Sequence, residues 1–346
     1  MKLSIPDAFI DRQCPGASAE EIEKISQFYK QWKLEQADAD SVYQVSREWL
    51  PIYEQYMAEV MQAHARHDIS GLKHMYENFF RHPLSTGLHG LHFDMVEHYM
   101  TPGKKPTTEH LRTYLESCAL GARNFLLTCP ATETEKLVRP PVGNPYSYDL
   151  AGHTIYPGGD YHYTFAEKIS ILLRKLDHPV IMELGGGFGG MAYYCMREMP
   201  HAKYICVDLP ENAALQAYYL KSHFPERKII LYGEAFTDGD YDALIMPGHH
   251  MDELKNSSIN LSFNSYSLAE MSKEAMENYV RIICNKTLDY FYHLNHVYWE
   301  ISADSFPIDL NKFQLLFRNP TNWGKDPSQY KLDQHEFLYK AKTSAI

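Results

Sequence analysis

The sequence lacks several features that would each point to a particular class of protein. No run of Lys and Arg occurs, and the formal net charge is −11, so we do not expect a nucleic-acid partner. No segment reaches the ~18 uninterrupted apolar residues of a membrane span, and the first residues carry no apolar signal core. The six cysteines form no C-x-x-C pair. These absences predict a cytoplasmic protein with reduced, buried thiols.

The composition predicts a globular chain with more than one part. Its 346 residues, 45% hydrophobic and 22% charged, can build a large core without disulfides. We divide it into a helical N-terminal region at 1–130, a covering loop at 131–163 and a sheet domain at 164–346. Ser18 opens a capping box, and apolar residues follow at helical spacing as far as Trp32. Further helices are predicted near 41–66, 70–81, 88–99 and 107–127.

From about residue 164 onward, apolar runs of strand length alternate with helical patterns, which is typical of a doubly wound sheet. The last two runs are close enough in sequence to pair as antiparallel neighbours. The predicted fold is therefore α/β, with a Rossmann-like sheet of seven strands that is mostly parallel and closes with an antiparallel strand. The predicted strands are 180–184, 204–208, 229–232, 259–264, 288–294, 313–318 and 336–340.

A glycine-rich turn follows the first of these strands and is the most informative passage of the chain. The strand runs into Glu183, the turn extends to Gly190, and the next strand ends at Asp208. Glycines at a strand-to-helix turn permit positive φ and let a ligand approach the backbone. An acid at the tip of the second strand can accept hydrogen bonds from ribose hydroxyls. This layout predicts a nucleoside-binding unit.

The glycines satisfy two patterns at once. Gly185, Gly187 and Gly190 fit the dinucleotide pattern G-x-G-x-x-G. Glu183 with Gly185, Gly187 and Gly189 fits E-x-G-x-G-x-G, which resembles the first motif of class I S-adenosylmethionine-dependent methyltransferases. The acid inside the strand and the position of the turn far from the N-terminus favour the second pattern.

Four passages together resemble the bacterial sugar O-methyltransferase family, a branch of the class I methyltransferases. The resemblance covers roughly residues 137–300 and leaves the N-terminal helices unmatched. It implies a class I methyltransferase fold, S-adenosylmethionine as methyl donor, and a sugar hydroxyl of a surface polysaccharide or glycoconjugate as acceptor. The passages are Arg139–Pro145, Tyr161–Tyr163, Glu183–Gly190 with Val207–Glu211, and Phe263–Met271.

On this interpretation, the donor lies beyond the carboxyl ends of the strands. Asp208 is expected to bind the ribose, Leu209 to pack on the adenine, and Glu234 with Ala235 to meet the adenine amino group. The expected donor-binding residues are Glu183, Gly185, Gly187, Gly189, Asp208, Leu209, Glu234, Ala235, Asn264, Ser265 and Tyr163. The expected acceptor-binding residues are Arg139, Asn144, His162 and Tyr266.

Methyl transfer to a hydroxyl needs a base that removes the proton as attack proceeds. His293 and His296 end the fifth predicted strand, and a strand-end histidine is suited to this role. Glu270, about one helical turn after Tyr266, is the third candidate. The alternative for Glu270 is an acid on a helix that is simply exposed to solvent and has no catalytic role.

We do not expect a catalytic metal. The runs His249–Glu253 and His293–Glu300 contain ligand types, but neither has a recognised metal spacing. With 18 histidines in the chain, such clusters also arise by chance. A divalent cation that acidifies the acceptor hydroxyl remains the less favoured alternative.

Three other functions remain open at this point. An NAD-dependent sugar oxidoreductase or epimerase would use a Tyr-x-x-x-Lys relay, and Tyr266–Glu270 lacks the Lys. A methyltransferase could act on a non-sugar small molecule. A binding protein with an inactive fold would have lost the glycine turn or Asp208, and both are present.

The N-terminal helices are expected to cap the acceptor site or to form a homo-oligomer contact.

Overall fold

The computed structural model of the chain describes residues 3–5, 7–45, 47–88, 106–235, 239–321, 323 and 333–342. The helix predicted near 88–99 therefore lies almost wholly outside the described residues. Within them, no helix is long and apolar enough to cross a membrane. The backbone contains no cis peptide bond in these ranges.

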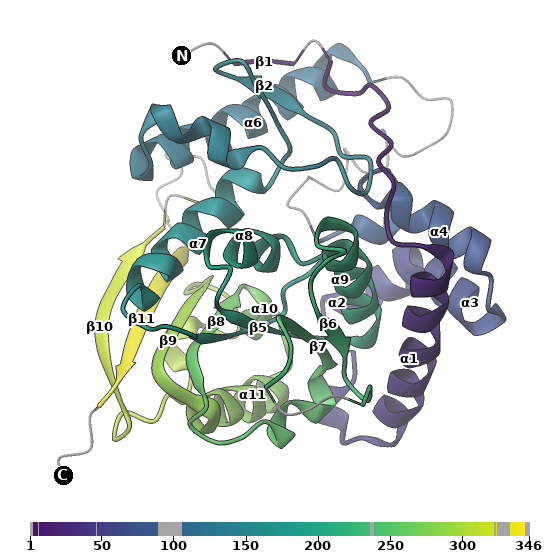
Figure 1. The fold of residues 1–346 in the computed structure, drawn as a ribbon. Helices are drawn as coiled ribbons and strands as arrows, with labels where there is room; N and C mark the ends of the chain where they lie inside the picture. The colour runs from purple at the N-terminus through teal and green to yellow at the C-terminus, as the bar shows by residue number, and fades with distance from the viewer. Residues whose placement is uncertain are drawn as a thin grey trace.

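An eight-stranded sheet forms the centre of the fold (Figure 1). Across the sheet the strand order is β10-β11-β9-β8-β4-β5-β7-β6. Strand β11 pairs antiparallel with both β9 and β10, and the other neighbouring strands pair parallel. This confirms a mostly parallel sheet with a closing antiparallel strand. The strands are β4 (Val180–Leu184), β5 (Lys203–Asp208), β6 (Ile229–Leu231), β7 (Ala243–Pro247), β8 (Ile259–Ser265), β9 (Thr287–His296), β10 (Phe313–Pro320) and β11 (Gln334–Ala341).

The predicted count of seven strands is wrong, because the sequence analysis missed β7. This strand lies between β5 and β6, and the predicted strand at 229–232 becomes β6 at the edge of the sheet. The apolar segment of β7 is short and ends in Pro247, and proline usually interrupts a strand. Proline is tolerated there because it is the last residue of the strand, opposite Asp208.

Helices cover both faces of the sheet (Figure 1). On one face, α7 (Gly159–Leu173), α8 (Gly190–Glu198) and α9 (Pro210–His223) share one apolar cluster. On the other, α10 (Ser267–Glu270) and α11 (Lys273–Lys286) belong to a second cluster. Strand β4 pairs with β5 on one side and β8 on the other, so the chain order reverses at this point. In open α/β sheets, ligands bind beyond the carboxyl ends of the strands at such a reversal.

The N-terminal helices pack directly on the sheet domain. Helix α1 begins where the capping box predicted, with the Ser18 side chain accepting the Glu21 N–H at 3.1 Å. Its buried residues Ile22 and Trp32 belong to the same cluster as α7–α9. A domain boundary at residue 130 thus stays a prediction. The helices are α1 (Ala19–Asp38), α2 (Trp49–Ile52), a π-helical turn (Tyr53–Met57), α3 (Ala58–Arg66), α4 (Ile69–Glu77) and α6 (Thr108–Thr128), with 3₁₀ turns at Ser41–Tyr43, Phe79–Arg81, Pro83–Ser85, Ala131–Leu137, Gly248–Glu253 and Ala303–Ser305.

A small second sheet joins the N-terminus to the predicted covering loop. Strands β1 (Leu3–Ser4), β2 (Tyr148–Leu150) and β3 (His153–Ile155) pair antiparallel. These three short strands, in the regions predicted as mostly helical and as a covering loop, were not predicted from the sequence, and α7 already begins at Gly159. Strands of two or three residues are too short to show alternation. The turn at Ala151 and Gly152, with φ of +55° and +86°, lacks the Asn-Gly signature of such hairpins.

Trp32 provides a test of how firmly α1 is bound to the sheet. Its side chain is fully buried, and its Nε1 donates to the Tyr232 carbonyl at 3.0 Å. We expect Trp32→Ala to lower the free energy of unfolding by about 3–5 kcal/mol, because it leaves a cavity and an unpaired carbonyl. Leu34→Ala, on the exposed side of the same helix, should change it little. Urea unfolding of both variants measures this, and equal stabilities would show that α1 is only loosely attached.

Candidate functional site

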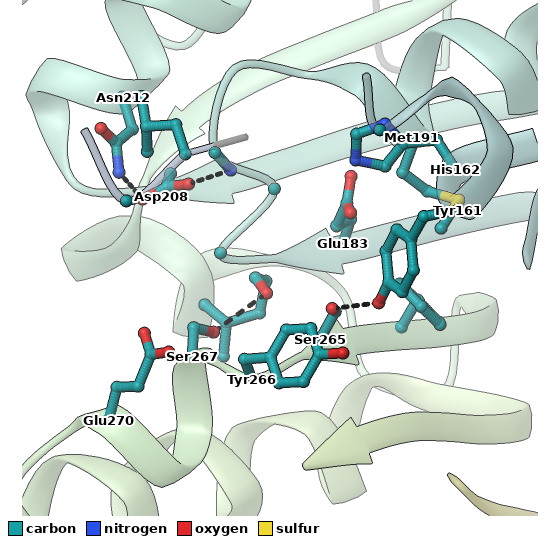
Figure 2. A pocket seen from close by; sticks show the side chains of 18 of the residues that line it. Tyr161, His162, Glu183, Met191, Asp208, Asn212, Ser265, Tyr266, Ser267 and Glu270 are labelled. Atoms are coloured by element: carbon teal, nitrogen blue, oxygen red, sulfur yellow. Dashed lines mark hydrogen bonds between the residues drawn. The ribbon is translucent and has the colours of Figure 1, made fainter. Parts of the chain in front are cut away.

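A cavity of about 390 Å³ lies beyond the carboxyl ends of β4, β5 and β8, at the point where the strand order reverses (Figure 2). Its floor is formed by the glycine turn after β4, the residues after β5 and those after β8. The first turn of α7 and residues from segments 42–45 and 117–124 complete its wall. Segments far apart in the sequence therefore meet at one site.

The glycine turn adopts the conformation that the sequence predicted. Gly185, Gly187 and Gly189 have φ of +76°, +59° and +93°, a region that other residues rarely adopt. A Cβ atom on Gly185 would also lie 2.2 Å from the Ser267 Oγ. The turn can therefore pack against the start of α10 only as glycine.

Asp208 holds the glycine turn in place. Its Oδ2 accepts hydrogen bonds from the Gly187 N–H and Gln216 Nε2, both at 3.0 Å. Its Oδ1 accepts from the Leu209 N–H at 2.8 Å and from Asn212 Nδ2 at 2.9 Å. Burial raises the pKa of Asp208 to about 6, although these donors favour the charged form.

Two amide oxygens beside Asp208 lack a hydrogen-bond donor among the described residues. They are Asn212 Oδ1 and Gln216 Oε1, both buried, and Asn212 also lines the cavity. A buried acceptor without a donor is costly, so a ligand hydroxyl at this position would be favourable. The sequence analysis missed both residues. Their spacing of four from Asp208 and from each other is the signal that could have found them.

Glu183 lies buried beneath the turn. Its Oε2 accepts a hydrogen bond from the Tyr204 hydroxyl at 2.8 Å. Burial, assisted by the charge of Asp208, raises the pKa of Glu183 to about 8. In the free protein this carboxyl group is therefore mostly protonated at neutral pH. A positive charge nearby would favour its ionised form.

The ionisable side chains around the cavity are mostly acids. Asp160, Glu183, Asp208 and Glu270 line it, and the described lining residues include no Lys or Arg. The one histidine among them, His162, is buried, which lowers its pKa to about 3 and keeps it neutral. Such a wall favours a cationic ligand and disfavours an anionic one.

One end of the cavity is aromatic. Tyr161 stacks on Tyr266 with ring centroids 6.3 Å apart, and Trp323 meets Tyr161 edge-on at 5.4 Å. The hydroxyl groups of Tyr161 and Ser265 are hydrogen-bonded at 2.5 Å (Figure 2). The backbone of Tyr266 has φ of +65°, and its hydroxyl donates to Gln334 Oε1 at 3.0 Å. Tyr161 and Trp323 were not among the predicted site residues.

Asp160 is a further residue that the sequence analysis missed. It lies in the first turn of α7, and its Oδ1 accepts the Tyr161 N–H at 2.9 Å. Burial raises its pKa to about 6. Gly121 of α6 makes room for it, since a Cβ there would lie 1.8 Å from Asp160 Oδ2. The acid directly before the Tyr161–Tyr163 passage was the available signal.

Of the three predicted bases, only Glu270 lines the cavity (Figure 2). Its Oε2 accepts a hydrogen bond from Trp49 Nε1 at 2.8 Å. Its second oxygen has no hydrogen bond to the described part of the chain. Burial raises the pKa of Glu270.

The two histidines of β9 do not line the cavity, contrary to the prediction. His293 is fully buried on the face of the sheet that α11 covers, where its ring stacks on Phe337 at 4.6 Å. His296 lies behind Tyr266, pairs with Asp333 at 2.5 Å and stacks on Trp299. Strand alternation alone did not reveal which face of β9 borders the site, because both faces carry aromatic residues.

Five of the predicted donor-binding residues do not line the cavity: Gly189 of the glycine turn, Glu234, Ala235, Asn264 and Tyr163. Glu234 pairs with Lys24 at 2.7 Å, and Ala235 is exposed. Asn264 is buried and donates to the Leu184 carbonyl at 2.9 Å, joining the ends of β4 and β8. The Tyr163 side chain is buried among Phe125 and Tyr194. The predicted donor residues that do line the cavity are Glu183, Gly185, Gly187, Asp208, Leu209 and Ser265.

The predicted acceptor-binding residues divide in the same way. His162 and Tyr266 line the cavity, whereas Arg139 and Asn144 do not. The buried Arg139 donates to the Tyr219 hydroxyl at 2.8 Å and lies over aromatic rings of the core. Asn144 has φ of +56° and its Nδ2 donates to Asp11 at 2.8 Å. Both residues hold loops together.

Comparisons with known proteins give only distant likenesses. No protein-family model matches the chain, and no curated protein matches it. Among solved structures, the chain is similar to the mitomycin 7-O-methyltransferase MmcR, with 11% identity over 53% of this chain and 55% of that chain and a TM-score of 0.35. It is also similar to magnesium protoporphyrin IX methyltransferase from Synechocystis PCC 6803 with bound S-adenosylmethionine (10% identity, 53% and 80% covered, TM-score 0.37).

A third similar structure is TrmN from Thermus thermophilus, with 12% identity, 52% of this chain and 49% of that chain covered, and a TM-score of 0.36. The chain thus spans about half the length of the mitomycin enzyme and of TrmN. TM-scores below 0.5 carry no argument about function. The resemblance to sugar O-methyltransferases therefore stays a prediction.

The burial of His293 predicts how stability depends on pH. Desolvation lowers its folded-state pKa to about 3, below the ~6.5 of an unfolded histidine, so stability is present above pH ~6.5 and is lost as pH falls toward ~3. His293→Phe keeps the ring stacking and should reduce the loss between about pH 7 and pH 5 by about 2 kcal/mol. Urea unfolding at both pH values tests this against His178→Phe, an exposed control. Equal pH slopes for His293→Phe and the wild type would contradict the assignment.

Proposed function

We propose that the chain is an S-adenosylmethionine-dependent methyltransferase. The observation that carries the proposal is the cavity at the glycine turn, which is lined by four carboxyl groups and, among the described residues, by no Lys or Arg. When bound, the donor supplies a methyl group on a positively charged sulfur together with an ammonium group. An acid-lined wall stabilises both charges.

The same wall argues against a nicotinamide dinucleotide. Dinucleotide sites use backbone N–H groups of the glycine turn and the helix N-terminus to bind the pyrophosphate anion. Here the Gly187 N–H already donates to the Asp208 carboxylate. A pyrophosphate would therefore face carboxylates in place of free donors.

The residues near Asp208 fit a ribose. One ribose hydroxyl could donate to the Asp208 carboxylate in place of one of its four present donors, and its neighbour could donate to the unpartnered Asn212 Oδ1. Leu209 beside them offers an apolar surface to the adenine. The glycine turn would carry the methionine portion toward α7, where Glu183 can gain charge as the ammonium group approaches.

For the acceptor we propose a sugar hydroxyl, bound at the aromatic end of the cavity. Tyr161, Tyr266 and Trp323 offer flat apolar faces, and the two tyrosines carry hydroxyl groups at their edges, which suits the apolar faces and polar rim of a sugar ring. The Ser265 hydroxyl adds a hydrogen-bonding group beside them. A planar aromatic acceptor such as a phenol would stack on the same rings. A methyl-transfer assay with sugars and phenols distinguishes the two kinds of acceptor.

We assign the base to Glu270. Its carboxyl group has one oxygen held by Trp49, and the other is free to take the proton of the acceptor hydroxyl. As the carbon–sulfur bond breaks and the carbon–oxygen bond forms, the proton passes to Glu270 and then to water. Burial raises the pKa of Glu270 and so brings it closer to the range useful for general-base catalysis.

The pKa of Asp208 predicts how donor affinity depends on pH. Ribose hydroxyls donate to the ionised carboxylate, so binding lowers the pKa of Asp208 and weakens as pH falls below about 6. Asp208→Asn should weaken S-adenosylmethionine binding at about pH 8 by about 1–3 kcal/mol and reduce the pH dependence. Asp242→Asn, whose side chain binds the Lys228 N–H outside the cavity, is the control. Calorimetric titration measures both, and unchanged binding by Asp208→Asn would remove Asp208 from the donor site.

Glu270→Gln tests the base and the acceptor together. Tritiated methyl groups from S-adenosylmethionine would be followed onto nucleotide sugars, free sugars and phenols. Turnover on the best acceptor should fall by ~10²–10⁴ with donor affinity nearly unchanged, because the amide cannot take the proton. Glu274→Gln, exposed at the start of α11, should behave as wild type. Full turnover in Glu270→Gln would exclude Glu270 as the base, and methylation of phenols alone would refute the sugar acceptor.

A further inference from the structure

A second cluster of ligand-type side chains lies apart from the cavity. Glu35 near the end of α1 meets His249 and His250, which follow β7, and none of the three lines the cavity. One ligand atom from each residue lies within 4.8 Å of the others. Glu35 Oε2 is 2.9 Å from His250 Nε2 and 3.8 Å from His249 Nε2.

These separations suit a small divalent cation. Zinc lies about 2.0–2.1 Å from histidine nitrogen and carboxylate oxygen, and a tetrahedral arrangement then puts neighbouring ligand atoms about 3.3 Å apart. The two distances from Glu35 Oε2 lie on either side of this value. Shifts of a few tenths of an ångström would bring the three atoms around one ion.

Outer contacts already orient two of the three ligands. Glu35 Oε1 accepts a hydrogen bond from Gln31 Nε2 at 2.8 Å, which leaves Oε2 facing the histidines. His250 Nδ1 lies 2.6 Å from Glu253 Oε1, and Glu253 is in turn bound by the Tyr232 hydroxyl. A carboxylate on the far nitrogen of a histidine fixes its tautomer and directs the other nitrogen at a metal.

His249 supplies the observation that the protein's own hydrogen bonds leave unexplained. Its Nε2 is buried and has no hydrogen-bond partner among the described residues. The 3.8 Å to Glu35 Oε2 is too long for a hydrogen bond. A buried nitrogen in this state is costly, and a cation between the two atoms would satisfy it.

We propose that Glu35, His249 and His250 form a binding site for a borderline-soft divalent cation of the zinc type. Two imidazoles and one carboxylate suit zinc, whereas magnesium and calcium prefer an all-oxygen shell. The ion would tie the end of α1 to the end of β7. The segment 42–45 that follows α1 borders the cavity, so the ion would also steady that part of its wall.

The proposal is tested on the full, tag-free chain after treatment with a chelator. Titration with Zn²⁺ should show one saturable site that Mg²⁺ does not fill, and zinc should raise the thermal midpoint. His249→Ala and Glu35→Gln should lose this site, and Glu253→Gln should weaken it about 10–100-fold, the usual effect of removing an outer partner. His178→Ala removes an exposed histidine elsewhere and should bind zinc as the wild type does.

Glu35→Gln keeps the shape of a partly exposed side chain, so it guards against loss of binding through misfolding. Its thermal midpoint without zinc shows whether it remains folded. The proposal is overturned if the wild type has no saturable zinc site, or if Glu35→Gln and His249→Ala both bind zinc like the wild type.

Discussion

The arrangement of the candidate site depends on the carboxylate of Asp208. It joins the glycine turn after β4 to the end of β5 and to the first turns of α9, which directly follows β5. Its two oxygens accept four hydrogen bonds from Gly187, Leu209, Asn212 and Gln216. Glycine adopts positive φ without steric strain but loses much conformational freedom when it is ordered. The network offsets that loss by fixing the turn from one side, while α10 packs on the other.

Burial of the acids gives the cavity its chemical character. Desolvation raises the pKa values of Glu183, Asp208 and Asp160, so each carboxyl group holds its proton more strongly than it would in water. A neutral or anionic ligand does little to stabilise the ionised forms of these carboxyl groups. A ligand that brings positive charge and hydrogen-bond donors stabilises their ionised forms, and its binding is coupled to their protonation.

The sequence predicted those parts of the site that depend on local backbone chemistry. The glycine turn and Asp208 could be found because their residue types are required by one short strand–turn–helix–strand passage. His293 was assigned wrongly, because the face on which a strand residue lies follows from the pairing of β9 with its neighbours. Trp323 and the meeting of Glu35 with His249 could not be predicted, since only tertiary packing brings these distant segments to their sites.

We infer that the acid-lined cavity at the glycine turn binds S-adenosylmethionine and does not bind a dinucleotide. Titration of the wild-type chain with S-adenosylmethionine and, separately, with NAD tests it most directly, because both ligands carry an adenosine and differ in charge at the turn. We expect saturable binding of one S-adenosylmethionine per chain and no saturable binding of NAD. Saturable NAD binding, with none for S-adenosylmethionine, would contradict it.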